Sequence, residues 1–175
     1  YLSYLAAAIV GEPHTSIGVE RVPSLVEFAA SRAAAVPALS ELSFVQFVRA
    51  DLFRLDVDAG AGFSRIYVGG GATAAAVSRL RRLLRPGGLM VVPRDEELVR
   101  ITRDAAAPDV FHTDVVTTVR FATLVEDPLG LARFVPPVDA ERADTVHDAV
   151  LCGLGGVSAS SCRSTLSLEA ARRPS

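Results

Sequence analysis

Cysteine is scarce in this chain, and neither sign of charge dominates. The two cysteines, Cys152 and Cys162, lie in a serine- and glycine-rich stretch without metal-type pairing, which favours free thiols in an intracellular compartment. A formal net charge of -2 gives no electrostatic basis for nucleic acid as the main partner. No apolar run approaches the roughly 18–20 residues of a membrane span, and Leu2–Val10 lacks the basic flank of a signal peptide. We therefore expect a cytoplasmic protein with no membrane partner.

Half of the 175 residues are hydrophobic and 22% are charged, which is typical of a globular domain with a sizeable core. The most informative segment is 63–93, FSRIYVGGGATAAAVSRLRRLLRPGGLMVVP. Its spacing predicts a strand at Ile66–Val68, a triple glycine, an amphipathic helix, a Pro86-Gly87-Gly88 turn and a strand at Leu89–Val92. Such a βαβ unit predicts a parallel sheet with a ligand site at the carboxyl ends of its strands.

The rest of the chain alternates in the same way between helical and strand patterns. Glu96–Arg103 fits either a helical turn or a strand. Beyond Gly153 the sequence is small and polar, which predicts a mobile tail. The remaining predicted elements are helices at 1–10, 23–35 and 140–152, and strands at Ile17–Glu20, Phe44–Asp51 and Asp114–Val125.

Polar or glycine residues stand where these strands end. Glu20 ends one strand, Asp51 ends the next, and Gly69–Gly71 end a third. A carboxylate at such a position can accept hydrogen bonds from a ribose, and glycine lets the backbone approach a cofactor. Each residue alone also fits a simpler role: a solvated loop glutamate, an aspartate capping the next turn, or a tight strand-to-helix turn. Their joint occurrence in this order favours a nucleotide-like ligand.

These residues carry a resemblance to a known family. In order, GVERVPSLVEFA, FVRADLF, FSRIYVGGGA, LLRPGGLMVVP and VRFATLVEDP resemble the protein-L-isoaspartate O-methyltransferases over about residues 1–128. LLRPGG is common to many S-adenosylmethionine enzymes, whereas RIYVGGGA joined to VRFATLV is more specific. RIYVGGGA and the VEDP ending are most similar to methyltransferase-domain-containing relatives, which in animals carry a C-terminal extension that recruits a ubiquitin ligase.

The resemblance implies a Rossmann-like α/β methyltransferase fold with S-adenosyl-L-methionine as cofactor. In it Glu20 would bind the ribose and Asp51 the adenine, while Gly69 and Gly70 would border the methionine and the substrate groove. Leu52 departs from the small residue that is usual in the family at this position. No metal site is implied and no catalytic residue is assigned. The implied cofactor-binding residues are Tyr1, Glu20, Arg21, Asp51, Leu52, Gly69 and Gly70.

In the family, the helix beginning YLS follows a first strand and a GxGxG loop. We therefore expect residues 1–128 to form a partial methyltransferase domain lacking that strand and loop, with 129–175 as a C-terminal extension. The absent strand would leave a gap or an edge beside Ile17–Glu20 or Ile66–Val68. On this reasoning the 175 residues alone bind S-adenosylmethionine poorly and are inactive.

Three functions remain open at this stage. The first is a carboxyl methyltransferase that acts on isoaspartyl residues of damaged proteins. An isoaspartyl carboxylate, with a pKa of about 4, needs no general base, so His14, His112 and His147 are expected to be surface or loop residues. The second is a non-catalytic cofactor-binding adaptor of a ubiquitin ligase, whose extension binds a protein partner. The third is a methyltransferase for another acceptor. The arginine-rich segment 79–85 is either a solvated face or an anion site.

Overall fold

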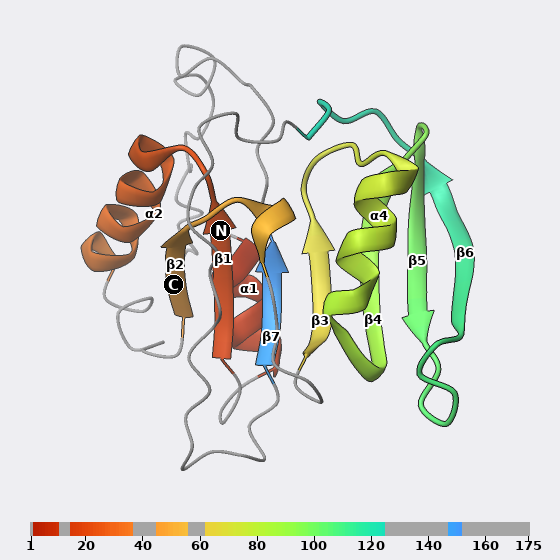
Figure 1. The fold of residues 1–175 in the computed structure, drawn as a ribbon. Coiled ribbons are helices and arrows are strands. Elements are labelled where there is room, and N and C mark those ends of the chain that lie inside the picture. Colours follow the sequence, from red (N-terminus) through yellow and green to blue (C-terminus); the bar gives the residue numbers. More distant parts are fainter. Residues whose placement is uncertain (1, 11–14, 37–44, 56–61, 125–146, 152–175) are drawn as a thin grey trace, which may run out of the picture.

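Seven strands form one mixed sheet in the computed structural model, which describes residues 2–10, 15–36, 45–55, 62–124 and 147–151 (Figure 1). The strand order is β2-β1-β7-β3-β4-β5-β6. The strands are β1 (Thr15–Glu20), β2 (Val45–Arg49), β3 (Phe63–Val68), β4 (Leu84–Arg94), β5 (Glu97–Arg103), β6 (Phe111–Thr118) and β7 (His147–Leu151). The helices are α1 (Leu2–Val10), α2 (Pro23–Ala35) and α4 (Ala74–Leu80), with short 3₁₀ turns η1 (Leu52–Arg54) and η2 (Arg81–Leu83).

The five strands from β2 to β4 are parallel, so their carboxyl ends share one edge of the sheet. The two remaining strands are antiparallel, with β5 paired to β4 and β6 paired to β5. Asp95 and Glu96 connect β4 to β5 with φ angles of 50° and 65°, both in the left-handed region that a tight hairpin turn requires. Glu97–Arg103 is therefore a strand, which resolves the choice that the sequence left open.

Helices pack on both faces of the sheet. α1 lies behind it against β1, β7 and β2, and α4 lies in front against β4 (Figure 1). Tyr4 of α1 packs on Phe47 of β2, with ring centroids 5.6 Å apart. The Thr73 hydroxyl accepts a hydrogen bond from the Ala76 amide and so caps α4. Within the described residues, no helix is long and apolar enough to span a membrane.

The hydrophobic core lies where α4 covers β3 and β4. Its side chains are β-branched or aliphatic for the most part, and along β3 and β4 they recur at alternate residues such as Ile66 and Val68 or Met90 and Val92, which point to the same face of the sheet. Each fully buried Leu, Val or Met side chain contributes about 1.5–3 kcal/mol through removal of apolar surface from water. The most deeply buried residues in this region are Phe63, Ile66, Val68, Leu80, Leu84, Met90, Val92 and Val99.

Two predictions about the middle of the sheet are contradicted by the structure. The expected gap beside Ile17–Glu20 or Ile66–Val68 is absent, because β7 pairs in parallel with both β1 and β3. The helix predicted over 140–152 is wrong for His147–Leu151, which form that strand, while 140–146 lie outside the described residues. A strand forms there because the inner edges of β1 and β3 offer backbone donors and acceptors that would otherwise be buried without partners.

Smaller differences concern the ends of elements. The strand predicted at Asp114–Val125 begins earlier and ends at Thr118, after which the chain crosses the carboxyl edge of the sheet. Pro86-Gly87-Gly88 lie inside β4 as a bulge and do not form a turn before it. Gly87 has a φ of 75°, and a Cβ on Gly88 would come within 2.8 Å of the carbonyl oxygens of Arg85 and Phe63. Glycine therefore fits both positions.

Candidate functional site

The candidate site is the carboxyl edge of the parallel strands, which is the upper edge of the sheet in Figure 1. From β1 the chain proceeds through α2 to β2 on one side, and from β3 through α4 to β4 on the other side. The strand order therefore reverses around β7. Ligands of open α/β sheets bind outside the carboxyl ends of the strands at such a reversal.

Glu20 is half-buried at the end of β1, where its side chain bonds to the two residues that lead into α2. Its Oε1 accepts hydrogen bonds from the backbone amides of Arg21 at 2.8 Å and Val22 at 2.9 Å. Pro23 then begins the helix, at a position where its missing N–H leaves no bond unmade. Because two amide donors hold one oxygen, the carboxylate has a fixed orientation at the edge.

Asp51 lies beside it, just after β2, and is 1% exposed. Its Oδ1 accepts a hydrogen bond from the Phe53 amide at 2.9 Å, so it caps η1. The Ala50 amide donates to the Glu20 carbonyl at 3.1 Å and joins the two strand ends. The capping role that the sequence allowed for Asp51 is therefore present, and the same side chain stands one strand away from Glu20.

The glycines at the end of β3 meet a distant segment of the chain. The Gly71 amide donates to the Ala122 carbonyl at 2.8 Å, and the Leu124 amide donates to the Gly71 carbonyl at 2.9 Å. Gly71 and Thr123 thereby form a short parallel bridge. The two most specific sequence motifs, RIYVGGGA and VRFATLV, are thus in direct contact. The segment Phe121–Leu124 was predicted as a strand only, and its place at this edge was missed because no sequence signal pairs it with the glycines.

The other predicted site residues are placed as follows. Gly69 is half-buried and Gly70 is buried at the end of β3. Arg21 is half-buried beside Glu20, and Leu52 is half-buried in η1, where it packs against the core. Tyr1 lies outside the described residues. The structure therefore brings the described residues of the predicted site to one edge, whereas their contacts with a cofactor stay a prediction.

Sequence reasoning missed β7, which stands between the Glu20 side of this edge and the Gly69 side. The signal was present in the sequence as Ala149-Val150-Leu151 followed by Cys152-Gly153-Leu154-Gly155-Gly156, an apolar run that stops at glycines. Polar residues upstream of this run suggested a capped helix instead.

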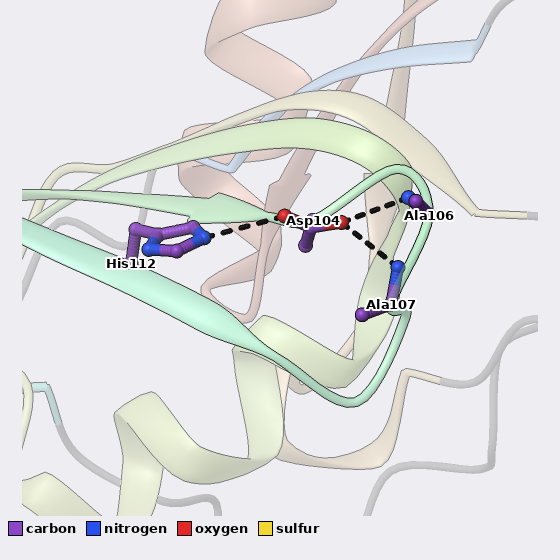
Figure 2. Close-up of polar contacts among 4 residues, drawn as sticks. All are labelled: Asp104, Ala106, Ala107 and His112. Atoms are coloured by element: carbon purple, nitrogen blue, oxygen red, sulfur yellow. Dashed lines mark hydrogen bonds and ion pairs between the residues drawn. The ribbon is translucent and has the colours of Figure 1, made fainter.

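Neither of the two described histidines, His112 and His147, lies at the candidate edge. His112 is exposed on β6, and its Nε2 lies 3.4 Å from Asp104 Oδ2 in the turn between β5 and β6 (Figure 2). The pKa of Asp104 is below its ordinary value because its carboxylate accepts hydrogen bonds from the Ala107 and Ala106 amides and contacts His112. His14 lies outside the described residues, and His147 begins β7. Among the described residues, no cluster of carboxylate, histidine and cysteine side chains could hold a metal ion.

The arginine-rich segment is divided between two environments. Arg79 and Arg82 are exposed, as expected for a solvated face. The Arg81 guanidinium instead stands 4.6 Å from the centre of the Phe111 ring, which Arg103 also approaches at 5.8 Å. Such cation–π contacts tie η2 to β5 and β6 and give Arg81 a structural role.

Comparison with known proteins agrees with this geometry. A crystal structure from Plasmodium falciparum, named as a protein-L-isoaspartate O-methyltransferase and solved with S-adenosyl-L-homocysteine, matches with a TM-score of 0.52 and 21% identity. The match covers 65% of this chain and 53% of that protein, so the chain spans about half its length. The fold is therefore that of the Rossmann-like S-adenosylmethionine-dependent methyltransferases. The model of the protein-L-isoaspartate(D-aspartate) O-methyltransferase family matches residues 1–128. The chain belongs to that family.

Proposed function

We propose that this chain is an S-adenosyl-L-methionine-dependent carboxyl O-methyltransferase whose acceptors are L-isoaspartyl residues of damaged proteins. Family membership over residues 1–128 supports the cofactor and the acceptor class. The observation that carries the proposal is the pair of oriented carboxylates, Glu20 and Asp51, at adjacent strand ends opposite the glycines of β3.

The residues at this edge fit the cofactor chemically. S-adenosyl-L-methionine supplies an electrophilic methyl group on a sulfonium centre. Glu20 offers a carboxylate suited to hydroxyl donors, and Asp51 offers one suited to an exocyclic amine. Asp51 is 1% exposed and its Oδ1 accepts a hydrogen bond from the Phe53 amide, so its carboxylate is held in place at the strand end.

The acceptor carboxylate requires little from the protein in acid–base chemistry. With a pKa of about 4 it is already ionised at neutral pH. The residues of the edge then have two tasks, which are to align the two reactants and to exclude water.

The features that suggested a ubiquitin-ligase adaptor give that function no support. The C-terminal extension on which that alternative rests, residues 129–175, is described only at His147–Leu151, which form a strand and not the helix expected at 140–152. The expectation of weak cofactor binding and inactivity stays a prediction, although β7 fills the position in the sheet that was expected to be open.

The test is transfer of a radiolabelled methyl group from S-adenosylmethionine to an isoaspartyl peptide, with the same peptide carrying ordinary aspartate as control. We expect base-labile label on the isoaspartyl peptide alone. Cofactor binding without transfer would contradict the proposed activity, and transfer to other acceptors alone would contradict the proposed substrate.

A further inference from the structure

The candidate edge is divided between two halves of the sheet. One half, β1 and β2, carries Glu20 and Asp51, and the other half, β3 to β6, begins with the strand that ends at Gly69–Gly71. Among the residues that the structure describes, no ladder joins β1 directly to β3. β7 stands between them and pairs with both (Figure 1).

The pairing register of β7 with β1 and with β3 determines how the residues of the two halves align along the strand direction. Ala149 is opposite Ile17 on one side and Ile66 on the other, and Val150 is opposite Gly18 and Tyr67. Glu20 lies two residues beyond Gly18, and Gly69 lies two residues beyond Tyr67. The two therefore reach the edge at the same height, two strand spacings or about 10 Å apart.

We propose that β7 is a positioning strand for cofactor binding: docking of His147–Leu151 between β1 and β3 holds the carboxylate half and the glycine half of the edge in register. This inference rests on the proposed function, because it concerns the same cofactor edge. It assigns a role to a carboxyl-terminal segment that lies outside residues 1–128, which match the family.

Linkage makes the proposal measurable. A ligand that contacts both halves binds the form with β7 docked, so its binding opposes release of β7. A ligand confined to one half leaves the release of β7 unchanged. The antiparallel hairpin of β5 and β6 provides an internal reference, because its ladder does not involve β7.

The experiment measures amide hydrogen exchange of the full chain with and without S-adenosyl-L-homocysteine. At about 100 times the Kd we expect exchange of the His147–Leu151 amides to slow by up to about 100-fold, while β6 amides that exchange by local fraying change little. If exchange in β7 responds no more than exchange in β6, the proposal is overturned.

A variant pair gives a second, independent readout. Ala149→Pro removes a backbone donor in the middle of a strand paired on both sides and should weaken binding of S-adenosyl-L-homocysteine by about 5- to 150-fold. Ala159→Pro, the same change beyond the strand, should leave binding unchanged. Equal loss in both variants contradicts the proposal. A full chain that binds no S-adenosyl-L-homocysteine overturns the proposed function and this inference with it, whereas binding without a response in β7 overturns this inference alone.

Discussion

Replacing Asp51 with asparagine separates the two roles of this residue. In the folded chain its Oδ1 accepts the Phe53 amide hydrogen bond at 2.9 Å and caps η1. Asparagine keeps an oxygen acceptor and nearly the same size, and the two residues are about equal as helix caps, so stability should change by about 0.5 kcal/mol or less. The negative charge, however, is lost.

The expected cost in binding follows from that lost charge. A hydrogen bond to a charged group contributes about 1–1.5 kcal/mol more than one to a neutral group, so Asp51→Asn should bind S-adenosyl-L-homocysteine about 5- to 13-fold more weakly. Asp51→Ala also removes the cap and should lose about 1 kcal/mol of stability in addition. Titration calorimetry gives the Kd, and urea unfolding of each variant gives the stability.

Asp114→Asn is the matched control. Asp114 is an exposed carboxylate on β6, 2.8 Å from Arg100 Nη2 and far along the sheet from Asp51. Its replacement should leave the Kd unchanged and cost less than about 1 kcal/mol of stability. If Asp51→Asn binds within twofold of the unsubstituted chain, Asp51 does not contact the cofactor and is a cap alone.

Two further predictions concern the frame around the site. Gly88→Ala would place a Cβ 2.8 Å from the Arg85 and Phe63 carbonyl oxygens, so we expect the free energy of unfolding to fall by about 1–3 kcal/mol, measured as a lower thermal midpoint. Gly71→Ala is the control, because its Cβ would meet ordinary 3.5 Å contacts and should change the stability by less than about 0.5 kcal/mol. Equal losses in the two variants would refute the steric argument. Because the folded pKa of Asp104 lies below its ordinary value of about 3.9, its hydrogen bonds stabilise the β5–β6 turn above that pH and are lost as pH falls through the folded pKa. The protection of the Ala106 and Ala107 amides, measured against their intrinsic exchange rate at each pH, should then fall in acid, and Asp104→Asn should remove that pH dependence of protection.

The elements that the sequence predicted well are those that local pattern determines. α2 begins at Pro23 and ends at Ala35, as its apolar stripe and first-turn proline indicate. The triple glycine follows a β-branched and aromatic strand, and the strand ends where expected, at Val68. Glu20 and Asp51 reach one edge because the ends of parallel strands coincide. These predictions needed no knowledge of distant contacts.

The contacts that the sequence could not supply are those between distant segments. Gly71 pairs with Thr123, which is more than fifty residues away in the chain. The local sequence around each of them predicts only an ordinary loop or strand. Pro86-Gly87-Gly88 has turn chemistry, yet in the pairing of β4 with β3 it forms a bulge between the Phe63–Leu84 and Arg65–Leu89 partners. Such features depend on the partner strand, which local propensity does not specify.

β7 is the strongest case of this kind, and it changes how the site is interpreted. Local pattern over 140–152 predicts a capped helix, whereas the inner edges of β1 and β3 select a strand for His147–Leu151. Strand propensity depends more on neighbours than helix propensity does, so such a segment can take either form. If the space between β1 and β3 were left empty, each backbone N–H or C=O group on their facing edges would lack a hydrogen-bond partner, and each such group would lower the stability of the fold. That cost, repeated over five residues on two sides, outweighs a marginal preference for helix. The same residues therefore join β1 to β3, so that the stability of β7 and the geometry of the candidate edge depend on one set of hydrogen bonds.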